Sequence, residues 1–226
     1  MTTPRRYGPA ILAALLIAAG CRSPKYAQYA SRAGDFVCEV PWGWSVAADV
    51  AGGDYANITF TGPLEPDFFR GVPSLSVRWH RANTPHRLPD GTYEMYASAD
   101  DFIRQMMRDV YGAQAQIWAG ADRDIRQAQG EGRPLAHSQR IKVSDREATY
   151  FVVFRTLKAP EGKTYGVIRS DSGERAVLQR HGYAVVPVRG GFYALVYPAT
   201  RDGFEKYRPA FFRLLNTFRL LKEGPA

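Results

Sequence analysis

The stretch GYAVVPVRGGFYALVY, residues 182–197, contains two apolar runs on either side of the pair Gly190-Gly191. A glycine pair between runs of β-branched and aromatic residues is typical of a tight β-hairpin. Both runs are apolar at odd and even positions alike, so they lack the alternation of a sheet with one wet face. We therefore expect an antiparallel ribbon at the centre of a sheet whose two faces are both covered.

Two amphipathic segments could cover those faces. Ser98 is a helix N-cap candidate before apolar residues at helical spacing from Phe102 to Val110. The residues Asp202 and Glu205 have the spacing of a capping box, and apolar residues at helical spacing follow them, with Pro209 among them. The fold class predicted is α+β: an α/β/α sandwich with a mainly antiparallel sheet covered by helices on both faces.

Further strands are expected from β-branched and aromatic runs bounded by Gly, Pro or Asp. One more hairpin is predicted to turn at Ser144-Asp145. Residues 113–134 have no clear pattern, and residues 158–179 are expected to be mobile. The expected strands are residues 36–40, 57–61, 75–79, 140–143 and 148–157.

The N-terminus has the features of an export signal. Arg5 and Arg6 precede an uncharged run, residues 10–20, that ends in Ile17-Ala-Ala-Gly-Cys21 and resembles the lipobox of bacterial lipoproteins. A helix over that run is about 16 Å long, too short for a hydrocarbon core of about 30 Å. We expect residues 1–20 to be a signal peptide and Cys21 to be lipidated.

The domain boundaries follow from this expectation. Residues 21–34 are predicted to be the lipidated cysteine and a flexible tether, residues 35–222 a single domain, and residues 223–226 a tail. The protein is expected to be exported and held on a membrane by the lipid. Because Arg22, and not Asp, follows the cysteine, the outer membrane facing the periplasm is favoured in a Gram-negative host.

Several motifs resemble the PsbP-like family, as a bacterial lipoprotein, over residues 35–221. They are Phe36-x-x-x-Val40-Pro41-x-Gly43-Trp44, the stretch 182–197, Tyr207-x-Pro209-x-Phe211-Phe212 and Leu215-Asn216-Thr217-Phe218. The resemblance implies an antiparallel sheet between helices, and binding or assembly in place of catalysis. It carries no metal or partner site over to this sequence, because the matching residues belong to the core and the turns.

Composition limits the partners. The 226-residue chain has a formal net charge of +8, which falls to +6 when a signal peptide containing Arg5 and Arg6 is removed. Basic and aromatic residues do not interleave, and an exported domain rarely meets nucleic acid, so nucleic-acid binding is not expected. The two cysteines are Cys21 and Cys38. With the first lipidated no disulfide is expected, and Cys38 is interpreted as a small buried hydrophobe.

No catalytic motif or cofactor motif is present in the sequence: it has no Gly-x-Ser-x-Gly, no His-Glu-x-x-His and no Cys-x-x-Cys. The four histidines, His80, His86, His137 and His181, lack the spacing of metal ligands, although His80 and His86 could flank one loop. Catalytic residues, cofactors and metals are therefore not expected.

Two groups of residues are candidates for binding. Phe68, Phe69 and Arg70 lie in a loop bounded by Pro and Gly, where exposed rings could anchor a protein partner unless they fold back on the sheet. A groove for a small apolar ligand could involve aromatic residues near the strand ends, although such rings more often pack in a core. The groove candidates are Trp42, Trp44, Tyr55 and Phe60.

The function expected from these features is that of a lipid-anchored, non-enzymatic cell-envelope protein, which binds an envelope protein or assists assembly of an envelope complex. Two alternatives stay open. One is a carrier or sensor of a small apolar ligand. The other is an envelope hydrolase whose site would pair a serine or an acid with one of the four histidines.

Overall fold

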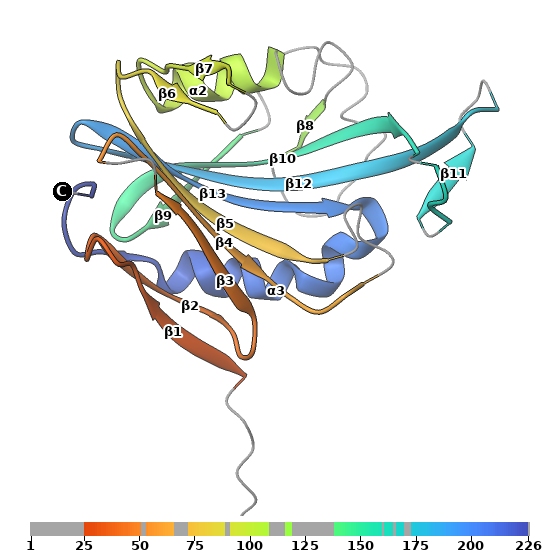
Figure 1. Cartoon of the computed structure of the whole chain (residues 1–226), viewed down its shortest axis with the longest axis horizontal. Coiled ribbons are helices and arrows are strands. Elements are labelled where there is room, and N and C mark those ends of the chain that lie inside the picture. Colours follow the sequence, from red (N-terminus) through yellow and green to blue (C-terminus); the bar gives the residue numbers. More distant parts are fainter. Residues whose placement is uncertain are drawn as a thin grey trace, which may run out of the picture.

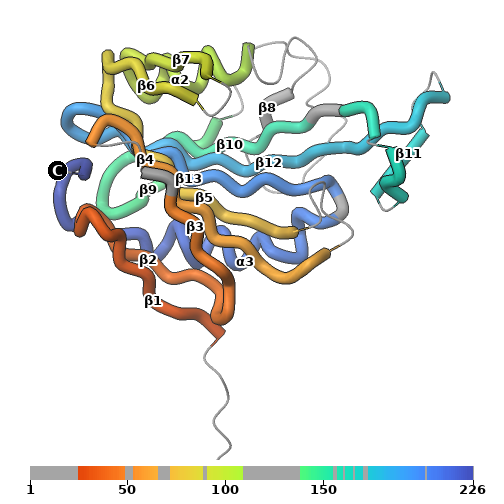
Figure 2. Tube along the Cα trace, in the orientation of Figure 1, coloured from red at the N-terminus to blue at the C-terminus, as the bar shows by residue number. Residues whose placement is uncertain are grey.

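A computed structural model describes residues 25–50, 53–65, 72–88, 91–108, 116–118, 138–159, 161–164, 166–169 and 173–225; the rest of the chain is grey in Figure 2. Most of the elements are strands (Figure 1). In chain order they are β1 (Tyr26–Ala30), β2 (Phe36–Pro41), β3 (Ser45–Val50), β4 (Tyr55–Thr61), β5 (Ser74–Arg81), β6 (His86–Arg87), β7 (Tyr93–Glu94), α2 (Ala99–Met106), β8 (Gln116–Trp118), β9 (Gln139–Val143), β10 (Arg146–Lys158), β11 (Val167–Arg169), β12 (Arg175–Val188), β13 (Gly191–Thr200), α3 (Arg201–Thr217) and β14 (Arg219–Leu220).

A large antiparallel sheet forms the centre of the molecule. Its strand order is β3-β4-β5-β13-β12-β10-β8, with β9 paired to β10 and β11 paired to β12. The predicted glycine hairpin is confirmed, since Val188 pairs with Gly191 across the turn between β12 and β13. The predicted hairpin at Ser144-Asp145 is also confirmed: both residues have positive φ, 53° and 61°, as a type I′ turn requires.

One face of this sheet packs against α3 and a small sheet of order β1-β2-β14. Side chains from all these elements form one buried cluster, which includes Phe36, Phe60, Tyr193, Phe211 and Phe218. The N-cap of α3 is Thr200, whose hydroxyl accepts a hydrogen bond from the Gly203 amide. The aromatic residues at helical spacing in the C-terminal sequence are therefore core residues.

The other face of the sheet packs against α2. Ser98 caps this helix, as the sequence predicts, by accepting a hydrogen bond from the Asp101 amide. Phe102, Ile103 and Met106 of α2 join a second buried cluster with Phe192 and Val185 of the central hairpin. The central ribbon is thus buried on both of its faces.

The predicted α/β/α sandwich with helices covering both faces is wrong. The protein is mostly antiparallel β-sheet, with 52% of residues in strands, 17% in helices and two helices among the described residues. The eight residues of α2 span about 12 Å, whereas the 14 residues of β12 extend over about 46 Å. One short helix cannot cover such a face, and on the opposite face α3 shares the covering with β1, β2 and β14.

The flexible tether predicted at residues 21–34 is also corrected in part. Residues Tyr26–Ala30 form β1, which pairs with β2 from Tyr26 opposite Pro41 to Ala30 opposite Val37. Tyr29 packs edge-on against the buried Phe60 ring, with 4.9 Å between the ring centroids. The folded domain therefore includes a strand within the residues predicted to be the tether.

Candidate metal centre

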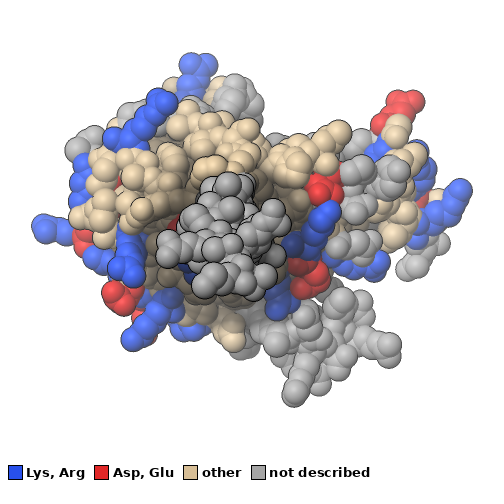
Figure 3. Space-filling view, turned by 90° about the horizontal axis from the view of Figure 1, so that it is seen from below, with Lys and Arg blue, Asp and Glu red and all other residues tan. Residues whose placement is uncertain are grey.

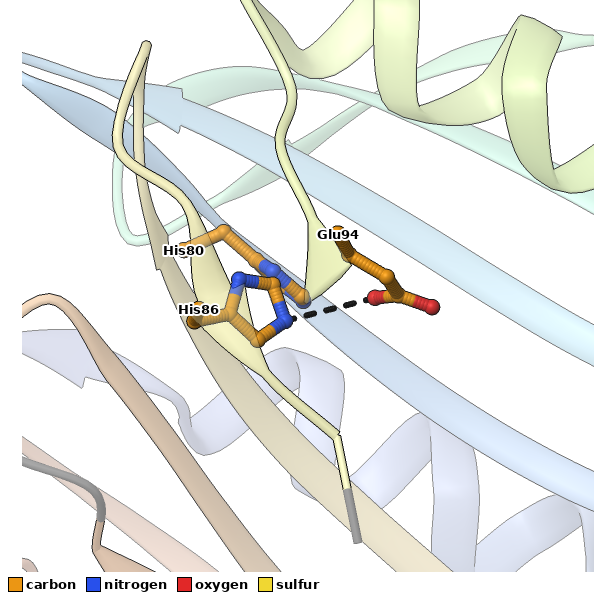
Figure 4. A group of neighbouring side chains, drawn as sticks. All are labelled: His80, His86 and Glu94. Carbon is orange, nitrogen blue, oxygen red and sulfur yellow. Dashed lines mark ion pairs between the residues drawn. The ribbon is translucent and has the colours of Figure 1, made fainter. Parts of the chain in front are cut away.

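Three potential metal ligands come together where β5 ends and the short hairpin of β6 and β7 begins (Figure 4). His80 lies on β5, and His86 and Glu94 face each other across the β6–β7 pair. The chain reverses between β5 and β6 at Asn83, which has a φ of 55° and whose amide donates to the Tyr96 carbonyl. This reversal brings His80 and His86, six positions apart in the chain, into one site.

The ligand atoms of the three side chains all lie within 4.8 Å of one another. His86 Nε2 is 3.3 Å from Glu94 Oε2, in the range of an ion pair. Both imidazoles are buried, while the Glu94 side chain is 30% exposed. The site is therefore closed on the histidine side and reaches solvent at the carboxylate.

Three of the four imidazole nitrogens of His80 and His86 make no hydrogen bond with the described part of the chain. Among the described residues, neither ring nitrogen of His80 is hydrogen-bonded, and Nε2 of His86 approaches Glu94 without the alignment of a hydrogen bond. A buried polar atom without a partner costs about 1–3 kcal/mol. Three such atoms in two neighbouring imidazoles, with a carboxylate beside one of them, indicate that the site is shaped for a further group.

The electrostatics keep the imidazoles neutral. Burial, together with the nearby His86 and Arg78, lowers the pKa of His80 to about 3. Burial also lowers the pKa of His86, and the Glu94 carboxylate acts in the opposite direction. A metal binds the neutral imidazole, so protons compete little for these nitrogens near neutral pH.

Aromatic rings surround the two imidazoles and fix their orientation. Tyr55 of β4 stacks on His86 with 4.3 Å between centroids and 5° between planes. Phe192 of β13 stacks on His80 at 5.0 Å, and Tyr96 and Phe102 each lie 5.4 Å from His80. An apolar shell of this kind keeps water from the ligands and lowers the local dielectric constant.

Two imidazoles and one carboxylate suit a divalent transition metal better than calcium or magnesium, which take oxygen ligands. Ligands about 2.0–2.1 Å from a tetrahedral zinc ion lie about 3.3 Å from each other, which equals the separation of His86 and Glu94. The other ligand atoms lie at most 4.8 Å apart, so side-chain movements of about 1.5 Å would bring them to the separation of about 3.3 Å in a tetrahedral site. The residues therefore fit a zinc-class ion with a fourth coordination position open.

Comparisons with known proteins concern the fold alone. No protein-family model matches the sequence, and no curated protein matches it. In structure the chain is similar to a protein from Bacteroides thetaiotaomicron VPI-5482, with 10% identity and a TM-score of 0.43 over 88% of this chain; it spans 50% of that protein.

It is also similar to the solution structure of cyanobacterial PsbP (CyanoP) from Synechocystis sp. PCC 6803. The identity is 12% and the TM-score 0.44, over 89% of this chain and 95% of that one. This neighbour bears the name of the family that the sequence motifs resemble. At these values the likeness says nothing about a site or an activity.

The residues predicted for lipidation and partner binding lie outside the described part of the chain. This holds for Cys21 and for Phe68, Phe69 and Arg70, so these assignments stay predictions. Within the described residues no helix has the length and apolarity needed to cross a membrane. Cys38 is a free, buried thiol, and burial raises its pKa to about 12, which suits a core residue and not a nucleophile.

The structure separates the four residues predicted to line a groove. Phe60 is fully buried in the core, and Trp44 contacts Tyr207 of α3 edge-on at 5.5 Å. Trp42 is exposed in the turn between β2 and β3. Tyr55 alone belongs to the histidine cluster, so the described structure does not bring these four rings to one binding surface.

The sequence alone does not predict the candidate metal centre. The closeness of His80 and His86 in the chain is its signal, and Glu94 follows eight positions after His86. His181 lies on β12 opposite Val153 and Pro198, and His137 is outside the described residues. The His86–Glu94 pair also supplies the acid beside a histidine that the hydrolase alternative requires.

Proposed function

We propose that this chain is a lipid-anchored, non-enzymatic cell-envelope protein whose folded domain binds one divalent transition-metal ion of the zinc class. The observation that carries the proposal is that one ligand atom from each of His80, His86 and Glu94 lies within 4.8 Å of the other two. Three imidazole nitrogens of the two buried histidines also make no hydrogen bond with the described residues. The motifs at Phe36–Trp44 and at residues 182–197 support the finer assignment to the PsbP-like lipoproteins.

The position of the site supports a role directed away from the membrane. The described chain begins at Lys25, next to β1, whereas the hairpin of β6 and β7 lies at the opposite end of the molecule (Figure 1). A lipid on Cys21 would hold the first end at the bilayer. The metal centre would then face the surrounding compartment, where ions and partners are accessible.

Metal binding is tested on the full-length protein purified in detergent from membranes and stripped with a chelator. Equilibrium dialysis against Zn²⁺, followed by elemental analysis, should give one ion per chain. Glu94→Gln keeps the shape of the side chain and removes the charged ligand, and His86→Asn removes an imidazole. Each should weaken Zn²⁺ binding at least about tenfold, as loss of one ligand of three requires.

The matched control is His181→Asn, which removes a histidine outside the cluster. Its Zn²⁺ affinity should equal that of the unaltered protein. Binding of less than one ion per chain, or an equal loss of affinity in His181→Asn and His86→Asn, would overturn the proposal. Circular dichroism of each variant establishes that the fold is kept.

The lipid anchor is tested by Cys21→Ser. This change should leave the signal peptide uncleaved by the lipoprotein pathway and leave the protein without acyl chains, since the thiol is the acceptor. Mass spectrometry of the mature N-terminus reads both outcomes. An unmodified thiol at Cys21 in the unaltered protein would contradict this part of the proposal without touching the metal centre.

Binding of an envelope protein through Phe68, Phe69 and Arg70 remains part of the proposed function. Crosslinking in membranes should recover a partner with the unaltered protein and lose it with Phe68→Ser or Phe69→Ser. Equal recovery with both variants would remove these residues from the proposal. Recovery of the same partner with a Glu94→Gln variant would show that binding of the partner does not depend on the metal.

A further inference from the structure

The turn between β2 and β3 carries an exposed tryptophan. Trp42 is 56% exposed, and the turn is fixed by Gly43, which has a φ of 78°, and by Trp44, which packs on Tyr207. A tryptophan ring held in water on a rigid turn exposes a large apolar surface with one polar N–H group. Such rings are enriched where an apolar phase meets water, at protein interfaces and at membrane surfaces.

This turn lies beside the point where the chain enters the domain. The Trp42 amide donates a 3.1 Å hydrogen bond to the carbonyl of Lys25, the first described residue. Cys21 precedes Lys25 by four residues, so the two Cα atoms can be at most about 14 Å apart. A lipid on Cys21 therefore keeps Lys25 and Trp42 close to the headgroup layer, because the remaining chain is too short to move the domain away.

The same end of the molecule carries positive charge and further apolar surface. Lys25 is exposed, and both its ammonium and the Arg213 guanidinium lie 5.7 Å from the Tyr26 ring. Arg213 is partly neutralised by Glu39, at 2.7 Å. Figure 3 looks at this end and shows Lys and Arg side chains around its edge, with Asp and Glu side chains among them.

A second exposed apolar side chain is connected to the turn through packed residues. Trp44 contacts Tyr207, whose hydroxyl donates to Glu65, and the preceding residue, Leu64, is 78% exposed. Lys206 pairs with the same Glu65 at 2.8 Å. Exposed apolar side chains beside lysines favour binding to a surface that contains anionic phospholipid.

We propose that this end of the domain rests on the bilayer, with the Trp42 ring in the headgroup layer of a membrane that contains anionic phospholipid. The inference rests on the proposed lipid anchor at Cys21. It adds an orientation: the β2–β3 turn faces the lipid, and the hairpin of β6 and β7 faces away. The acyl chains and the exposed turn then hold the domain at two points, which limits its rotation about the anchor.

The experiment uses the lipidated protein isolated from membranes and reconstituted into vesicles of phosphatidylethanolamine and phosphatidylglycerol. Bromine on the upper part of the acyl chains quenches tryptophans that lie near the headgroups. The unaltered protein should be quenched about twofold more than Trp42→Phe, because Trp42 is the ring placed at the interface. The remaining tryptophans are the same in both proteins, so the difference reports Trp42 alone.

The matched control moves the probe to the far end. Tyr93, 70% exposed on β7, is changed to Trp in the Trp42→Phe background, and this ring should not be quenched. Quenching of Tyr93→Trp that equals that of Trp42 would overturn the orientation. Absence of any Trp42 quenching in protein that sediments with the vesicles would overturn the bilayer contact and leave the anchor intact.

Two further outcomes test the bilayer contact of Trp42 together with the lipid anchor at Cys21 on which it rests. Protein that does not sediment with vesicles after reconstitution would overturn the lipid anchor and the bilayer contact together, whereas metal binding would stand. A photo-crosslinker placed at position 42 in native membranes should label phospholipid. Labelling of one specific protein in place of lipid would show that the turn is a protein-binding surface and would overturn the proposal.

Discussion

The phenolic hydroxyl of Tyr193 donates a 2.5 Å hydrogen bond to the carboxylate of Asp35, 158 positions earlier in the chain. The other oxygen of this buried carboxylate accepts from the Ser31 hydroxyl, and the Asp35 carbonyl accepts from the amides of Leu221 and Lys222. One residue thus joins the β1–β2 hairpin, the central strand β13 and the segment that follows β14. A buried carboxylate is stable in such a place only when hydrogen bonds replace its hydration.

Removal of that hydroxyl should destabilise the whole domain. Tyr193→Phe leaves Asp35 with one donor fewer in a buried position, which should lower the free energy of unfolding by about 1–3 kcal/mol. Urea unfolding followed by circular dichroism measures the loss. Tyr197→Phe is the matched control, because Tyr197 is equally buried on the same strand and its hydroxyl donates to uncharged backbone carbonyls, those of Phe204 at 3.0 Å and Gly203 at 3.2 Å. A loss in Tyr197→Phe as large as in Tyr193→Phe would contradict a special role of the carboxylate.

The two glycines of the central hairpin should respond differently to alanine. A Cβ on Gly191 would lie 2.2 Å from the His80 carbonyl oxygen and 2.5 Å from the Trp79 ring, whereas a Cβ on Gly190 would meet no atom within 4 Å. We expect Gly191→Ala to cost about 2–3 kcal/mol of stability by overpacking. Gly190→Ala should cost about 1 kcal/mol through its positive φ. Thermal unfolding of both variants gives the order, and a reversed order would refute the close approach at Gly191.

The sequence predicted the parts of the fold that local chemistry determines. The turn at Gly190-Gly191, the turn at Ser144-Asp145 and the Ser98 cap each depend on residues within a few positions of one another, and all three are confirmed. The helix at the C-terminus was also expected, although its cap is Thr200 in place of Asp202, and α3 continues through Pro209. Its buried aromatic residues hold it against the sheet, so tertiary packing outweighs the local effect of the proline.

The errors concern contacts between distant segments. The sequence of β1 has two tyrosines among Ala and Gln and no apolar run, so its strand character comes from pairing with β2 and from the contact of Tyr29 with Phe60. The covering of the sheet could not be predicted either, because amphipathic spacing gives a helix without giving the length of the strands it must cover. The strands β10 and β12, of 13 and 14 residues, extend beyond the eight-residue α2.

The candidate metal centre depends on a hairpin that has almost no sequence signal. β6 and β7 have two residues each, too few for any alternation to be visible. His80 and His86 have five residues between them, at the upper end of the histidine spacing in zinc fingers, but no cysteine pair accompanies them, and Glu94 follows eight positions after His86. Only the pairing of His86 with Glu94, and the reversal at Asn83, place the three side chains together.

The stacking of Tyr55 on His86 should contribute to metal affinity by holding the imidazole in place. Tyr55→Leu removes the ring at 4.3 Å, and since an aromatic pair contributes about 0.5–1.5 kcal/mol, Zn²⁺ affinity should fall about threefold to tenfold. Tyr55→Phe keeps the ring and should bind as tightly as the unaltered protein. Isothermal titration calorimetry compares the three. Equal weakening in the phenylalanine variant would show that the ring face is not what orients His86.

The stability of the protein in chelating buffer should fall as the pH is lowered from 7 to 5. His80 has a pKa of about 3 in the folded protein because burial disfavours its charged form, whereas an exposed histidine in the unfolded chain has a pKa of about 6.5. Below pH 6.5 the unfolded state therefore binds a proton that the folded state does not, and protonation favours unfolding. The loss from His80 should amount to about 1–2 kcal/mol by pH 5. Urea midpoints at several pH values measure it, and His80→Phe, which packs among the same rings without a titrating group, should flatten the profile. A profile of unchanged slope in that variant would contradict a neutral His80 in the folded protein.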